Sequence, residues 1–68
     1  MINAAELEQK IADSGLKIDF IADSLGISRQ ALWEKRKNKQ PFNAREIVVL
    51  CKLLNITEPE EKVYIFLD

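Results

Sequence analysis

The sequence contains no histidine and only one cysteine, two glycines and two prolines. A single cysteine excludes an internal disulfide bond, which is typical of a protein that stays in a reducing cytoplasm. The chain also lacks an apolar run of about 18 residues, which a membrane-spanning helix requires. Its opening string MINAAELEQK has no apolar centre of the kind that export signals carry. We therefore expect a cytoplasmic protein with no membrane partner.

The sequence also lacks the residue patterns that are typical of enzyme active sites. The sequence has no glycine-rich phosphate loop, no metal-ligand spacing and no carboxylate pair placed for acid–base catalysis. The one cysteine, Cys51, falls in the middle of an apolar helical stripe, where cysteine is usually a small buried hydrophobic residue. We expect neither an enzyme nor a protein that binds a metal, a cofactor or a small molecule.

The apolar content of the chain is sufficient for one small folded unit. Its 68 residues are 47% hydrophobic and 31% charged, which is the composition of a globular domain. A domain below roughly 70–80 residues gains little stability from a single core. The sequence therefore predicts one domain over residues 1–68, with very well packed helices or with a dimer interface that adds buried area.

Residues 18–37 predict two short helices around a tight turn. Gly26 is expected to end the first helix, because glycine adopts positive φ without steric cost. Ser28 is suited to cap the second helix through its hydroxyl oxygen. The apolar residues before the turn have the spacing of one helix face: Ile18, Ile21, Ala22 and Leu25.

The side chains around this turn are those of a helix-turn-helix motif. The small side chain of Ala22 allows the second helix to cross closely, and Leu32 is expected to hold the pair from the other side. The outward face of the second helix carries long polar or aromatic side chains suited to base edges: Arg29, Gln30, Trp33, Glu34 and Lys37. The alternative is an ordinary helical hairpin in a small bundle.

The net charge of −1 hides a local excess of positive charge. Residues 29–45 contain six basic residues and one acid, whereas residues 1–28 and residues 46–68 each carry a net charge of −3. A local cluster, and not the sum over the chain, is what neutralises nucleic-acid phosphates. The alternative is a charged helix face that contacts only water.

The rest of the chain predicts three more helices, so the expected fold is an all-α, compact bundle of about five short helices. Asn3 is placed to cap a helix over residues 4–13, and Asn43 is placed to cap a fourth helix. The apolar stripe of that helix contains Ile47, Leu50, Cys51 and Leu54. Left-handed asparagines are expected to end the third and fourth helices: Asn38 and Asn55.

Residues 58–68 are expected to cover the core and to offer a dimer contact. Thr57 is predicted to cap a fifth helix with Pro59 in its first turn. This cap favours a helix for the apolar run 63–67, and a strand that pairs with a second subunit is the alternative. The candidate dimer residues are Leu53, Tyr64, Phe66 and Leu67.

Two strings carry a family resemblance, IADSLGISRQAL and LCKLLNIT. In the first, the matching positions are Ala22, Leu25, Gly26, Ile27, Ser28, Arg29 and Leu32. With this order of helices, the chain resembles the Cro-type phage and prophage repressors of the lambda-repressor-like helix-turn-helix superfamily. The resemblance extends over roughly residues 4–66.

The resemblance implies that the helix from Ser28 to Lys37 lies in the major groove of DNA. The implied base-reading residues are Ser28, Arg29, Gln30, Trp33, Glu34 and Lys37. The implied phosphate contacts are Lys17, Lys39, Asn43 and Ala44.

Two departures from the family's pattern stand out. Ile18 occupies a position where family members often have a glutamine that contacts the DNA backbone. Lys35 and Arg36 fill positions of which one tends to be apolar in the family. We expect the aliphatic stems of these two residues to cover the edge of the core while their charges reach out.

These features together predict a sequence-specific transcriptional regulator that binds double-stranded DNA. By resemblance it is a Cro-like repressor that acts as a homodimer on a pseudo-palindromic operator. The alternative is a protein-interaction module, an antirepressor or adaptor that grips another protein through its apolar C-terminus. The clustered positive charge favours DNA as the partner.

Overall fold

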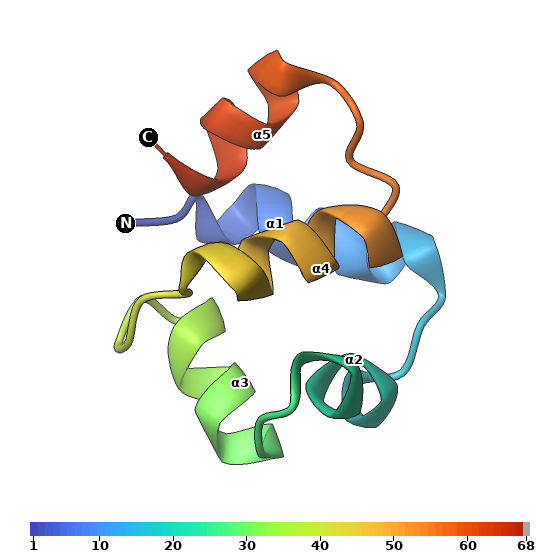
Figure 1. The fold of residues 1–68 in the computed structure, drawn as a ribbon, viewed down its shortest axis with the longest axis vertical. Helices are drawn as coiled ribbons and strands as arrows, with labels where there is room; N and C mark the ends of the chain where they lie inside the picture. The colour runs from blue at the N-terminus through green and yellow to red at the C-terminus, as the bar shows by residue number, and fades with distance from the viewer. Residues whose placement is uncertain (68) are drawn as a thin grey trace.

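The computed structural model describes residues 1–67, which form five α-helices. The helices are α1 (Ala4–Ser14), α2 (Ile18–Leu25), α3 (Arg29–Arg36), α4 (Ala44–Leu53) and α5 (Pro59–Phe66). In Figure 1, α1 and α4 cross the middle of the molecule, with α5 on one side and α2 and α3 on the other. The expected all-α class is confirmed, and residues 63–66 are helical.

Within residues 1–67, no helix combines the length and the apolar character that crossing a membrane requires.

Capping residues set the ends of most of these helices, as the sequence indicates. The Asn3 side chain accepts a hydrogen bond from the Glu6 N–H (3.3 Å), and the Ser28 hydroxyl accepts one from the Ala31 N–H (3.0 Å). Residues with positive φ follow α1 to α4, which releases the chain from each helix: Gly15 (71°), Gly26 (72°), Asn38 (62°) and Asn55 (58°).

The start of α5 differs from the predicted one. Thr57 is exposed and does not cap the helix, whereas Glu58, in an extended conformation (φ −83°, ψ 131°), directly precedes the first helical residue, Pro59. A proline ring disfavours helical backbone angles in the residue before it, so the helix cannot begin earlier than Pro59. The predicted Thr57 cap is wrong for this reason.

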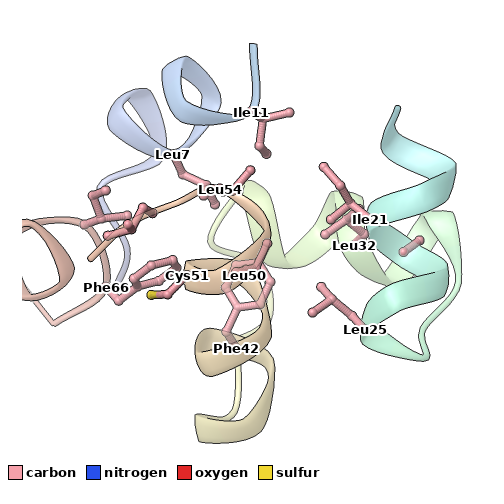
Figure 2. Close-up of a cluster of buried hydrophobic side chains, with 13 residues drawn as sticks. Leu7, Ile11, Ile21, Leu25, Leu32, Phe42, Leu50, Cys51, Leu54 and Phe66 are labelled. Atoms are coloured by element: carbon pink, nitrogen blue, oxygen red, sulfur yellow. The ribbon is translucent and has the colours of Figure 1, made fainter. Parts of the chain in front are cut away.

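All five helices contribute to one apolar core (Figure 2). Its most buried large side chains are Leu7, Ile21, Leu25, Leu32, Leu50 and Ile65. Ala22 is 2% exposed, in keeping with the predicted close approach of α2 and α3. Cys51 is also buried, and burial raises the pKa of its thiol, so it packs as a small neutral residue.

Phe66 belongs to this core and not to the outer face of α5. Its side chain is 5% exposed, and its ring meets that of Phe42 edge-on, with 6.3 Å between the centroids. The predicted role of Phe66 as a dimer contact is therefore wrong, because α5 turns this residue inward. Tyr64 and Leu67 are exposed, whereas Leu53 is half-buried against the core.

The segment before α1 is bound to two distant parts of the chain. The Asn38 amide pairs with the Ile2 backbone: its Oδ1 accepts from the Ile2 N–H (2.9 Å) and its Nδ2 donates to the Ile2 carbonyl oxygen (3.1 Å). The Asn3 N–H donates to the Ile65 carbonyl oxygen (2.7 Å). The N-terminal segment thereby links the loop after α3 to α5, and the start of α1 lies near the end of α5 in Figure 1.

Two basic residues of α3 point toward neighbouring helices. Lys35 Nζ lies 2.7 Å from Glu46 Oε1, and their side chains are 17% and 4% exposed. Arg36 donates to both carboxylate oxygens of Glu8 at 2.9 Å. The expectation that these charges reach out into solvent is wrong, because acids on α4 and α1 face them. Both ion pairs hold α3 against the rest of the bundle.

Candidate nucleic-acid interface

The exposed side of α3 and the start of α2 enclose a shallow hollow. Its lining consists of Ile18 from α2 and four residues from α3: Arg29, Gln30, Trp33 and Arg36. Arg29, Gln30 and Trp33 are exposed, as is Lys37 at the end of the helix. The structure thus brings three predicted base-reading residues together around one concave surface.

Two other predicted base-reading residues are engaged within the protein. The Ser28 hydroxyl oxygen accepts the capping hydrogen bond of α3, which leaves its hydroxyl hydrogen to donate elsewhere. Glu34 is half-buried, and its Oε2 accepts a hydrogen bond from Gln30 Nε2 (3.2 Å). Glu34 therefore orients the Gln30 amide, in addition to the base contact predicted for Glu34 itself.

Arg29 is paired across the turn with an acid of α2. Its Nε lies 2.8 Å from Asp19 Oδ1, and the two side chains are 75% and 67% exposed. Asp19 and Asp23 also line a second hollow together with Ser28 and Arg29, at the start of α3. Two carboxylates thus lie beside the first residues of the helix that is expected to read bases.

Two of the predicted phosphate contacts lie beside this face. Lys39 Nζ is 5.7 Å from the centroid of the Trp33 ring, a cation–π contact that holds the loop after α3 against the helix. Lys17 is exposed and directly precedes α2, next to Ile18 in the wall of the first hollow.

The start of α4 is less available to a phosphate than the sequence indicates. The Asn43 N–H donates to Glu46 Oε1 (2.9 Å), and the Asn43 side chain accepts from the Glu46 N–H (2.8 Å), so the two residues complete a capping box. The Asn43 N–H is therefore occupied. Of the two predicted residues, Ala44 is the one whose N–H has no partner inside its helix by position.

The charge state of Glu46 works against an anion at the same helix end. Burial raises the pKa of this carboxyl, but the hydrogen bonds from Lys35 and from the Asn43 N–H outweigh burial and lower the pKa below its ordinary value of 4.5. Glu46 is therefore a carboxylate at neutral pH, and it occupies the positive end of the α4 dipole.

Folding neutralises much of the positive charge that the sequence concentrates in residues 29–45. Four of the six basic residues have acidic partners: Arg29 with Asp19, Lys35 with Glu46, and both Arg36 and Lys37 with Glu8. In the described part of the chain, Lys39 and Arg45 form no ion pair. Attraction to phosphates consequently depends on fewer residues than the sequence indicates.

Two contacts of this region carry no signal in the sequence patterns. Asp19 is an ordinary acid in the first turn of a helix until the crossing of α2 and α3 brings it to Arg29. Arg45 donates from Nη1 to the Leu25 carbonyl oxygen (3.2 Å) and so ties α4 to the end of α2. Both contacts depend on how the helices pack.

No protein-family model, curated protein or solved structure matches the chain. Residues 1–67 also contain no group of three or more acidic, cysteine or histidine side chains placed to hold a metal ion. The geometry of the α2–α3 face and the resemblance of its sequence are therefore what bear on function.

Proposed function

We propose that the protein is a sequence-specific transcriptional regulator that binds double-stranded DNA with α3 in the major groove. The observation that carries this proposal is the exposed set of Arg29, Gln30 and Trp33 on a helix that is held firmly from behind. Leu32, on the opposite side of α3, is fully buried. Base recognition requires polar side chains on a rigid support of this kind.

The dimensions of α3 suit the groove. An α-helix with its side chains is about 10–12 Å in diameter, and the major groove of B-DNA is about 12 Å wide. The first residues of a recognition helix usually reach the base edges. In this orientation Arg29 donates to a guanine, Gln30 pairs with an adenine, and Trp33 contacts a thymine methyl group.

The resemblance to Cro-type repressors supports a narrower proposal, a repressor that acts as a homodimer in a bacterial cytoplasm. Two copies on a pseudo-palindromic operator place their α3 helices about 34 Å apart, one turn of B-DNA. The proposed contact between copies is the outer face of α5, where Val63, Tyr64 and Leu67 are 51%, 54% and 64% exposed.

Selection of bound sites from a random pool of duplex DNA tests this function. We expect an enriched sequence with two-fold symmetry and an affinity that falls steeply as salt is raised. Trp33 is the only tryptophan, and it lies on the proposed contact face, so its fluorescence should change when the selected site is added. No enrichment, together with no dependence on salt, would rule out DNA binding.

Arg29→Ala should weaken binding to the selected site by about 1–3 kcal/mol, the usual discrimination of a two-bond contact to guanine. Its effect on random duplex DNA should be much smaller. Lys39→Ala serves as the comparison, because loss of a phosphate contact should weaken binding to both DNAs alike and reduce the salt slope by about one. Equal losses for both variants on both DNAs would assign Arg29 to a phosphate.

The double replacement Tyr64→Lys and Leu67→Lys should convert the dimer to a monomer in sedimentation experiments. Both side chains are exposed, so the helix content measured by circular dichroism should not change. Val48→Lys alters an exposed apolar residue of α4 and should leave the dimer intact. A wild-type monomer at concentrations well above those that saturate DNA would remove the dimer from the proposal.

A protein-interaction module, an antirepressor or adaptor, is the second candidate, and the pairing of charges favours it. All three basic residues of α3 face acids within the protein, while the apolar side chains on the outside of α5 stay exposed. One simple experiment separates the two candidates: mixing the protein with random duplex DNA at low salt and measuring whether it binds. A folded protein that fails to bind there would be assigned to the second candidate.

A further inference from the structure

We propose that Asp19 is a positioning residue for Arg29, which aims the free edge of the guanidinium at a guanine and lowers affinity for DNA without that guanine. This inference rests on the proposed function. It adds that an acid on α2, outside the recognition helix, controls how strongly one base pair is preferred.

The geometry of the pair leaves the reading edge of Arg29 open. Asp19 Oδ1 lies 2.8 Å from Arg29 Nε in an ion pair. A guanidinium group has one edge formed by the two terminal nitrogens and another that includes Nε. Because Asp19 lies on the Nε side of the guanidinium, the terminal edge remains free for the O6 and N7 atoms of a guanine, which form a matching pair of acceptors.

The Arg29–Asp19 ion pair contributes little to the stability of the fold. Both side chains are more than half exposed, and exposed ion pairs usually contribute very little to stability. In a complex with DNA the same pair is shielded from water, so its electrostatic attraction becomes stronger. An arginine already held in its binding conformation also loses less side-chain entropy on binding.

The negative charge itself opposes indiscriminate binding. Asp19 and Asp23 both line the hollow at the start of α3, where an anionic phosphate would otherwise be attracted to the helix N-terminus. The positive charge of Arg29 is balanced by Asp19 until a guanine adds two further acceptors. Arg29 therefore adds little to the affinity for random DNA, whereas it adds its full contribution to the affinity for the correct site.

Asp19→Asn, compared with Asp23→Asn, tests the proposal. Both changes remove one negative charge from an exposed position on α2, but only Asp19 is paired with Arg29. We measure affinity for the selected site, for the same site with the guanine pair replaced, and for random duplex DNA. Both variants should bind random DNA several-fold more tightly, because each loses a carboxylate at the interface.

Only Asp19→Asn should lower the preference for the guanine pair, by about threefold to tenfold, which lies in the lower part of the range for side chains in contact. In an Arg29→Ala background, Asp19→Asn should leave the base preference unchanged. An equal preference in Asp19→Asn and the wild type would overturn the inference while leaving DNA binding intact. If the wild-type protein binds no duplex DNA, the proposed function fails, and this inference fails with it.

Discussion

Lys35→Met is expected to lower the free energy of unfolding by about 3 kcal/mol at neutral pH, because it leaves a buried carboxylate without its cation. Both oxygens of Glu46 accept from Lys35 Nζ at 2.7 Å, and the Glu46 side chain is 4% exposed. At roughly 0.1 kcal/mol per residue, a domain of this size has about 7 kcal/mol in total. Urea denaturation should therefore show a large shift of the midpoint.

The stability lost in Lys35→Met should become smaller as the pH is lowered. The pKa of Glu46 in the folded protein lies below its ordinary value of 4.5, so the stabilisation from its ion pair is complete above about pH 4.5 and is lost as pH falls through the lower, folded value. Without Lys35, burial is opposed mainly by the Asn43 N–H, and protonation of Glu46 should relieve the penalty. The difference between wild type and variant should therefore shrink in acid.

Lys52→Met is the matched control for this prediction. Lys52 is an exposed lysine on α4 that pairs with no acid within residues 1–67. Its replacement should change stability by less than about 0.5 kcal/mol, as is usual at the surface. A similar effect of both variants, or a difference for Lys35→Met that stays constant from neutral to acidic pH, would contradict the account of the Lys35–Glu46 pair.

Asn38→Ala is expected to destabilise the fold by about 2–3 kcal/mol, for two separate reasons. Alanine is strained at a φ of 62°, and the variant loses both hydrogen bonds to the Ile2 backbone. The N-terminal segment should then detach from the loop after α3. Thermal unfolding measures the loss, and hydrogen exchange at the Ile2 amide reports the detachment.

Asn55→Ala separates the two causes. Asn55 has nearly the same backbone conformation (φ 58°), but its side chain makes no hydrogen bond to another described residue. This variant should carry only the backbone cost, about 1 kcal/mol. If Asn38→Ala and Asn55→Ala were equally destabilising, the pairing of Asn38 with Ile2 would contribute nothing to the stability of the fold.

Features that depend on neighbours in the chain could be predicted from the sequence. Asn3, Ser28 and Asn43 cap helices as expected, and Gly26 and Asn38 have the positive φ that their positions require. A cap or a left-handed turn involves residues within about four positions of each other, so its residue types are visible in the sequence. The one local error, at Thr57, arose because Pro59 restricts the residue before it.

The core was also predictable in large part, because helical spacing identifies the buried face of each helix. Leu32, Leu50 and Cys51 are buried as their periodicity indicates. The exception is Phe66, which lies in a run of consecutive apolar residues. Such a run has no polar face, so spacing alone cannot separate the side chains that turn inward from Tyr64, which stays exposed.

The sequence by itself determined the all-α class, the ends of most helices, and the set of side chains on the outer face of α3. Only the tertiary structure decided which charges remain free. Arg36 meets Glu8 and Lys35 meets Glu46 across separations of 28 and 11 residues. Ion pairs between helices follow no period along the chain, since any exposed acid suits any base that packing brings near. For this reason the pairing of Arg29 with Asp19, on which the proposed base preference depends, becomes visible only once α2 and α3 cross.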